Sequence, residues 1–142
     1  RRAKEGGRVV ISSRKQKAVD EVVAELHARG LEAIGVPCHQ ASAKDRKALI
    51  EATVAKWGRI DVLVLNAAVN PAFGPTLKMS EEAFDKIFDV NVKSLWLFTR
   101  DVYPHLTKPG GAILTISSTG GFAPGPPLGL YAVSKTAVIG LT

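Results

Sequence analysis

The sequence of 142 residues contains a single cysteine, Cys38, and has no long uninterrupted run of apolar residues. One cysteine excludes an intramolecular disulfide bond and suits a reducing compartment, the cytoplasm or the peroxisome. Because Cys38 lies in an apolar stretch, we expect its thiol to be buried as a small hydrophobic group. The longest apolar stretches, such as 62–65 and 95–98, fall far short of the roughly 20 residues that a membrane-spanning helix needs, so none is predicted.

A basic stripe interleaved with aromatic residues is also missing, although the net charge is +6. Lysines and arginines are scattered along the chain and alternate with acidic residues, as in segment 43–51. Nucleic-acid-binding proteins instead gather basic side chains on one face or along one helix. We therefore expect an ordinary solvated surface and no nucleic-acid partner.

Strand and helix patterns alternate along the chain, whose 46% hydrophobic and 23% charged residues are ordinary for a globular protein. Runs rich in β-branched residues predict strands, and apolar residues at helical spacing predict helices. Gly30 and Gly58 stand where left-handed residues would end two helices, and Ser80 is the expected N-cap of a third. In chain order we expect strand 8–12, helix 15–29, strand 31–38, helix 45–57, strand 61–66, a long helix from 80 to about 105, strand 111–116 and a helix from 129 onward.

The strands are nearly continuous apolar runs, of which 61–66 is the clearest. Such strands favour burial on both faces and therefore a parallel sheet covered by helices on both sides. The predicted fold is α/β, a doubly wound parallel sheet that forms a single domain over residues 1–142. The chain opens with Arg1 and stops within an apolar helical pattern, so we expect it to be an internal piece of a longer protein.

Tyr131 and Lys135 stand four residues apart in the last predicted helix and therefore share one helix face. A tyrosine exchanges protons poorly at neutral pH, but a neighbouring ammonium stabilises the phenolate, so that such a pair can act as a general acid. Ser118 follows strand 111–116, at the sheet edge where open α/β folds bind ligands, and its hydroxyl could polarise a substrate carbonyl. Taken singly, each of these residues fits an ordinary helix or turn equally well.

Two asparagines occupy unusual positions. Asn66 precedes Ala67 and Ala68 at the end of the third strand, where small residues would let a flat ring or a backbone lie close; a simple turn is the alternative. Asn91 lies inside the long helix, where asparagine is unfavourable because its amide competes for backbone groups. It is either a satisfied buried amide or part of a polar relay.

Ser13, Arg14 and Lys15 directly follow the first strand, where a dinucleotide-binding fold tests the 2′ position of the ribose. An acidic residue there accepts a hydrogen bond from a free hydroxyl, whereas arginine or lysine pairs with a 2′-phosphate. Basic residues without an aspartate favour NADP(H) as the cofactor.

One ordered set of motifs resembles that of the short-chain dehydrogenase/reductase family over essentially the whole chain: Asn66-Ala67-Ala68, Asn91, Ser118, Tyr131 and Lys135. The stretches VVISSRKQ, LVLNAAVNP and YAVSKTAVIGLT are similar, more narrowly, to its NADPH-dependent carbonyl/retinal reductase and tropinone-reductase-like groups. The resemblance implies an incomplete NADP-binding domain of the Rossmann type, without its first strand and its C-terminal strands.

The reaction that the resemblance implies is hydride transfer from NADPH to a ketone or aldehyde, without a metal. Tyr131 would give its proton to the substrate oxygen while Ser118 hydrogen-bonds the same oxygen. Lys135 would favour the phenolate and, with Tyr131, contact the cofactor at the nicotinamide ribose. Asn91 would anchor a water that links this lysine to solvent.

Cofactor and substrate contacts follow from the same resemblance. Arg14, with Ser13 and Lys15, would take the adenosine 2′-phosphate, and Asn66 with Ala67 would line the adenosine side. The substrate is expected to be a small hydrophobic carbonyl or alcohol compound, with Phe122 and Leu128 of the Gly/Pro-rich segment 120–129, which is predicted as a loop, in the pocket wall. In the family, the helix that begins at Ser80 and the helix of Tyr131 commonly pack across a dimer or tetramer interface.

The chain departs from the family pattern in two places. His39-Gln40 stands where the family commonly has an aspartate that contacts adenine, and the glycine-rich T-G-x-x-x-G-x-G loop is absent. The missing strand would leave a gap between strands 8–12 and 61–66, so we expect these residues alone neither to fold properly nor to bind NADPH. An alternative hypothesis is a truncated, inactive isoform that acts as an interaction partner of full-length family members.

Overall fold

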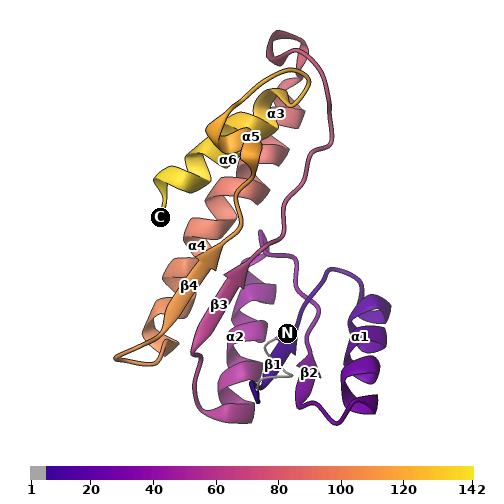
Figure 1. Ribbon diagram of the computed structural model, residues 1–142, viewed down its shortest axis with the longest axis vertical. Helices are drawn as coiled ribbons and strands as arrows, with labels where there is room; N and C mark the ends of the chain where they lie inside the picture. Colours follow the sequence, from indigo (N-terminus) through magenta and orange to yellow (C-terminus); the bar gives the residue numbers. More distant parts are fainter. Residues whose placement is uncertain (1–5) are drawn as a thin grey trace. The chain divides into compact units, whose positions relative to one another are not determined.

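The computed structural model describes residues 6–142 and shows the α/β order expected from the sequence (Figure 1). Its elements gather in two compact units, one ending at Arg59 and the other running from Ile60 to Thr142. The described strands form two parallel pairs, β1 with β2 and β3 with β4.

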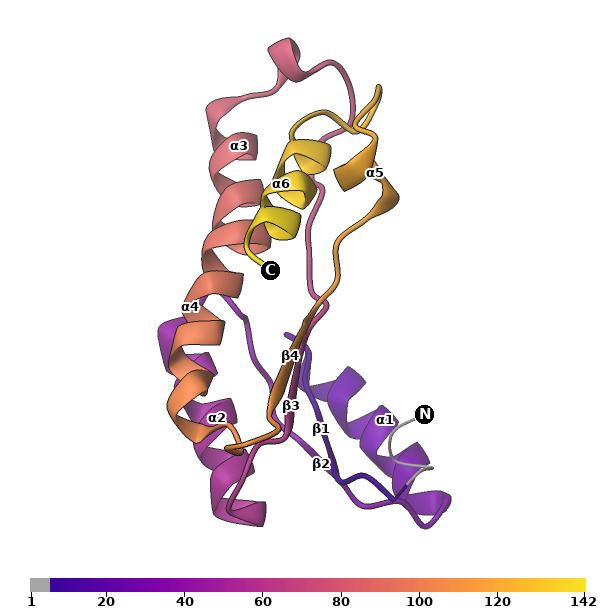
Figure 2. The same ribbon diagram turned by 60° about the vertical axis from the view of Figure 1, so that its left-hand side comes forward.

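The first unit alternates strand and helix: β1 (Val9–Ile11), α1 (Gln16–Ala28), β2 (Ala33–Gly35) and α2 (Ala43–Trp57). β1 and β2 pair in parallel, with Val9 opposite Ala33. The two helices lie on opposite faces of this pair (Figures 1 and 2). α1 packs closely because Gly35 has no side chain; a Cβ there would collide with the fully buried Val19.

The ends of the elements in this unit follow local chemistry. Ser42 caps α2 by accepting a hydrogen bond from the Asp45 amide at 3.3 Å, and Gly58 ends the helix in the left-handed region at φ +73°. β2 is shorter than the predicted strand 31–38 and ends at Gly35. Val36 still follows the neighbouring strand and donates from its amide to the Ile11 carbonyl at 3.0 Å.

The second unit contains the rest of the described elements. They are β3 (Val62–Leu65), η2 (Thr76–Lys78), α3 (Glu81–Phe88), η3 (Asp89–Lys93), α4 (Ser94–Val102), η4 (Tyr103–His105), β4 (Ala112–Thr115), α5 (Thr119–Phe122) and α6 (Gly129–Gly140). β3 and β4 pair in parallel, with Val62 opposite Ala112 and Leu65 opposite Thr115. α6 lies beside α3 and η3, which brings the end of the chain to the middle of the long helix (Figure 2).

The long helix predicted from residue 80 is present, but its middle is not α-helical. Ser80 caps it by accepting from the Ala83 amide at 3.2 Å, as predicted. Five residues, Asp89–Lys93, form a π-helical turn that the apolar spacing did not indicate. Single π-turns inside α-helices frequently occur at functional sites, and this one contains Asn91.

Two expectations about this unit are wrong. The strand predicted to be buried on both faces alternates instead, since Val64 is 54% exposed while Leu65 is 2% exposed. Successive strand residues point to opposite faces, and the described residues of this unit cover only one of them. The segment 120–129, predicted as loop, begins with the last part of α5, a single turn that Ser118 caps.

Cys38 is buried, as predicted, and burial raises the pKa of its thiol to about 11. No helix among residues 6–142 combines the length and the apolar character needed to cross a membrane.

Candidate active site

Lys135 is a buried cation beneath the tyrosine with which it was predicted to act. Its Nζ lies 5.7 Å from the centroid of the Tyr131 ring, and the residue is only 3% exposed. The ammonium donates to the Ile116 carbonyl at 2.7 Å, directly after β4. Desolvation by burial lowers the pKa of Lys135, since water no longer stabilises its charge. The structure therefore holds a buried ammonium against one face of Tyr131.

The turn α5 packs very closely against the helix of Tyr131 and Lys135. A Cβ at Gly121 would lie 2.8 Å from the Lys135 carbonyl oxygen, so only glycine fits without a shift. Ser117 donates to that same carbonyl at 2.8 Å, and Thr136 Oγ1 donates to the Gly121 carbonyl at 2.8 Å. Sequence reasoning missed Ser117 and Gly121, although both stand beside the predicted Ser118.

Ser118 is the N-cap of α5, and its Oγ accepts a hydrogen bond from the Gly120 amide at 3.2 Å. This bond occupies a lone pair of the hydroxyl but not its proton. The hydroxyl can therefore still donate to another group, which is the role predicted for it toward a substrate oxygen.

Asn91 is fully buried, and its hydrogen bonds agree with the first of the two predicted alternatives, a satisfied buried amide. Its Oδ1 accepts from the Val69 amide at 2.8 Å, and its Nδ2 donates to the Val69 carbonyl at 2.9 Å. The second proton of Nδ2 points to Ser134 Oγ at 3.1 Å. The amide is thus satisfied and also links three segments. Because both amide protons are taken, a water anchored by Asn91 would have to meet Oδ1 or the main-chain carbonyl.

The segment after β3 runs past this network. Asn66 and Ala67 are exposed, and Val69 is held by Asn91. Asn70 carries a buried Oδ1 atom that has no hydrogen-bond partner among the described residues. An orphaned buried acceptor is costly, so it suits a site that a ligand donor completes.

The basic stretch lies in the first unit, where the residues after β1 run beside those after β2. Ser13, Arg14 and Lys15 are exposed, and the Ser13 carbonyl accepts from the Cys38 amide at 3.0 Å. The neighbouring turn at His39 is fixed by Asp45, whose Oδ2 accepts from the His39 amide at 2.9 Å.

Two charged side chains, Asp45 and Arg46, are hydrogen-bonded to the backbone of that turn. The hydrogen bond from the His39 backbone, followed by the Ser42 hydroxyl, lowers the pKa of Asp45. The buried Arg46 donates to the Gln40 carbonyl at 2.8 Å. His39 Nδ1 accepts from the Ala41 amide at 3.2 Å, so Nε2 carries the proton when the ring is neutral. Sequence reasoning identified His39 but not the two charged residues that hold its turn.

The structure thus brings part of the predicted site together. All four proposed catalytic residues belong to the second unit: Asn91, Ser118, Tyr131 and Lys135. Tyr131 and Lys135 lie on α6, and Asn91 is hydrogen-bonded to Ser134 of the same helix. Ser13, Arg14 and Lys15 belong to the first unit. No group of three or more His, Cys, Asp or Glu side chains that could hold a metal occurs in the described part of the chain.

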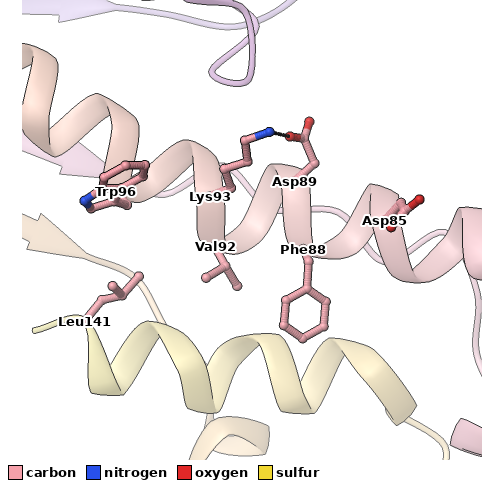
Figure 3. A pocket seen from close by; sticks show the side chains of 7 residues that line it. All are labelled: Asp85, Phe88, Asp89, Val92, Lys93, Trp96 and Leu141. Carbon is pink, nitrogen blue, oxygen red and sulfur yellow. Dashed lines mark ion pairs between the residues drawn. The ribbon is translucent and has the colours of Figure 1, made fainter.

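An open groove of about 610 Å³ lies elsewhere on the second unit, along the long helix and the end of α6 (Figure 3). None of the predicted site residues lines it. Lys93 and Asp89 form an ion pair at its edge, 3.5 Å between Nζ and Oδ1. Its lining is Asp85, Phe88, Asp89, Val92, Lys93, Trp96 and Leu141.

Comparisons with known proteins agree on one family. The family model described as short chain dehydrogenase matches residues 1–142. The short-chain dehydrogenase/reductase SDRA of Arabidopsis thaliana is 47% identical over 138 residues, 97% of this chain and 54% of its own length. Tropinone reductase-like 3 of Erythroxylum coca is 49% identical over 97% of this chain and 53% of its own length. Dehydrogenase/reductase SDR family member 4 of Sus scrofa is 49% identical over the whole chain and 51% of its own length.

Solved structures show the same likeness. A short chain dehydrogenase/reductase from Burkholderia phymatum, in complex with NAD, matches with a TM-score of 0.88 and 28% identity, over 94% of this chain and 48% of its own. A 3-ketoacyl-(acyl-carrier-protein) reductase from Brucella melitensis, complexed with NADH, matches with a TM-score of 0.88 and 32% identity, over 98% of this chain and 59% of its own. The chain spans about half the length of the curated relatives it matches. Its fold is part of a doubly wound α/β fold of the Rossmann type, as predicted.

Proposed function

The chain belongs to the short-chain dehydrogenase family, and we propose that it is part of an NADPH-dependent oxidoreductase that reduces ketone or aldehyde carbonyls by hydride transfer. The observation that carries this proposal is the buried Lys135 ammonium, 5.7 Å from the centroid of the Tyr131 ring. A buried charge is retained against its cost where chemistry needs it. In this proposal both units are parts of a single incomplete NADP-binding domain.

Tyr131 is the proposed general acid. It gives its proton to the substrate oxygen as the carbonyl carbon is reduced, while Ser118 donates its hydroxyl proton in a hydrogen bond to the same oxygen. The Lys135 ammonium stabilises the phenolate that remains. Hydrogen bonding of Nζ to the Ile116 carbonyl holds the charge in place, so little reorganisation is needed when the proton moves.

The nicotinamide cofactor would supply the hydride. Arg14, with Ser13 and Lys15, would bind the adenosine 2′-phosphate, because exposed cations follow β1 and their immediate sequence neighbours are not acidic. Asn66 and Ala67 would lie along the cofactor at the end of β3. The orphaned Asn70 Oδ1 fits such a ligand, since an amide or a ribose hydroxyl would give it a donor. The complexes of the solved relatives with NAD and NADH support a nicotinamide cofactor.

A small hydrophobic carbonyl compound is the proposed substrate. Phe122 is 78% exposed and is the last residue of α5, the turn that Ser118 caps, and Leu128 precedes α6. Apolar side chains at the mouth of the site would gain free energy by covering an apolar substrate.

A homodimer or homotetramer is the proposed assembly. The groove on the long helix presents Phe88, Val92, Trp96 and Leu141 on one exposed face (Figure 3). A second copy placed against this face would cover apolar area that is otherwise exposed to water. Light scattering on the purified protein measures the number of copies directly.

The test of the proposed reaction is NADPH oxidation with a panel of ketones and aldehydes, followed by absorbance. Tyr131→Phe should remove most turnover and leave NADPH binding nearly unchanged, since only the hydroxyl is lost. Tyr103→Phe is a matched control, because Tyr103 also has a lysine over its ring, Lys108 at 4.3 Å, but lies on η4 at the other end of the long helix. Retained turnover in Tyr131→Phe would exclude the role assigned to its hydroxyl.

A further inference from the structure

Ser134 is a fully buried polar residue directly before Lys135, and the proposed reaction gives it no task. Its Oγ donates to the Tyr131 carbonyl at 2.7 Å, one turn earlier in α6. The same oxygen lies 3.1 Å from Nδ2 of Asn91, in the π-helical turn of the long helix. Ser134 therefore touches the backbone of the proposed acid and the side chain of a second proposed site residue.

The directions of these hydrogen bonds are fixed. The Val69 amide needs an acceptor and finds Asn91 Oδ1, while the Val69 carbonyl needs a donor and finds Nδ2. Turning the amide over would set oxygen against oxygen, so its orientation follows from the network. The remaining Nδ2 proton goes to Ser134 Oγ, and the Ser134 hydroxyl proton then goes to the Tyr131 carbonyl.

This chain of bonds joins three segments that are distant in sequence. Ser134 lies on α6, Asn91 in η3, and Val69 follows the Asn66-Ala67-Ala68 stretch that would line the cofactor. Satisfied networks of buried polar groups hold their members in one arrangement, because an unmade bond there is costly. The distance from Tyr131 to the cofactor-lining segment would depend on this link.

We propose that Ser134 is a positioning residue: acting through Asn91, it sets the placement of the Tyr131–Lys135 helix relative to the segment 66–69. The proposal rests on the proposed function, because placement matters only if hydride and proton are delivered from these two sides. Hydride transfer needs reacting atoms held in near-contact, and a shift of about 1 Å can cost about a hundredfold in rate.

Ser94 provides a matched control for the experiment. It is also a buried serine on a helix, 1% exposed, and its Oγ donates to the Val90 carbonyl at 2.6 Å, one turn earlier. Both serines bond to a carbonyl of their own helical run, but only Ser134 also receives the Asn91 amide. Comparing Ser134→Ala with Ser94→Ala therefore isolates the link to Asn91 from the loss of a buried hydroxyl.

The first experiment measures amide hydrogen exchange in the full protein without cofactor. Ser134→Ala should raise the exchange rate of the Val69 amide about tenfold or more relative to the fully buried Val138 amide, which reports global opening. Ser94→Ala should leave this ratio within about twofold of the unsubstituted protein. An unchanged ratio in Ser134→Ala overturns the proposal, whatever the activity is.

The second experiment measures NADPH-dependent reduction kinetics for Ser134→Ala, Asn91→Ala and the double variant. Ser134→Ala should lower kcat about tenfold and leave the KM for NADPH within about twofold, since placement rather than binding is lost. The double variant should be no slower than Asn91→Ala alone, because the two residues act as one unit. Multiplying effects, or an effect confined to KM, would contradict positioning. If the unsubstituted protein reduces no carbonyl, the proposed function fails, and hydrogen exchange alone decides whether Ser134 holds the segment.

Discussion

Replacing Gly121 by alanine tests the close contact between α5 and the helix of Tyr131 and Lys135. The new methyl group would lie 2.8 Å from the Lys135 carbonyl oxygen and 2.9 Å from Ser117 Oγ. Overpacking of this kind typically costs about 1–3 kcal/mol. Alanine in a helical turn recovers about 0.5–1 kcal/mol relative to glycine. From the middle of these two ranges we expect a net loss of about 1 kcal/mol in the free energy of unfolding.

Urea unfolding of the full protein measures this loss as a lower midpoint with an unchanged slope. Gly140→Ala is the matched control, because Gly140 ends α6 and nothing lies within 4 Å of a Cβ built there. That variant should be as stable as the unsubstituted protein or slightly more stable. Equal midpoints for Gly121→Ala and Gly140→Ala would show that α5 moves away without cost, and would refute the reasoning.

Three further predictions follow from the first unit. Arg14→Asp should shift the ratio of kcat/KM for NADPH over NADH toward NADH by about a hundredfold, equal to about 2.7 kcal/mol, and an unchanged ratio would contradict the 2′-phosphate assignment. Hydrogen bonds from the His39 amide and Ser42 lower the pKa of Asp45, so the carboxylate stabilises the fold fully above its unfolded pKa of 3.8, and this stabilisation is lost as the pH falls through the folded pKa. Asp45→Asn should therefore make the free energy of unfolding, measured with urea, fall less steeply with decreasing pH in the acid range. A decrease as steep as in the unsubstituted protein would count against this role. Burial raises the pKa of Cys38 to about 11, so at pH 8 the thiolate is about a hundredfold scarcer than it would be with the ordinary pKa of 9.0. Iodoacetamide should therefore label the Cys38 thiol only as fast as the protein unfolds. Labelling as fast as that of a free thiol would refute this prediction.

Features set by neighbouring residues could be predicted from the sequence. The Ser80 cap and the glycines that end α1 and α2 are confirmed, because each depends on backbone groups within one turn. The helix positions of Tyr131 and Lys135 are likewise confirmed. Such features depend only on residues close in sequence, so they can be predicted without knowing the rest of the fold.

Features set by distant partners could not be predicted. The sequence marked Asn91 as an unusual helix residue, but its partner Val69 lies 22 residues away and uses only backbone atoms, which carry no sequence signal. The contact of Gly121 with the Lys135 carbonyl was missed for the same reason. The exposure of Val64 depends on which helices cover its face, and an apolar run does not encode that.

The π-helical turn at Asp89–Lys93 also fixes the phase of the long helix. α6 contacts α3 and η3, whereas the buried Phe98 and Val102 lie beyond the turn in α4. A π-turn holds one residue more than an α-turn, whereas the same extra residue in a regular α-helix would rotate everything downstream by about 100° and carry those two side chains out of the core. The π-turn therefore absorbs a residue that an unbroken α-helix could not hold without turning the side chains of α4 away from the core.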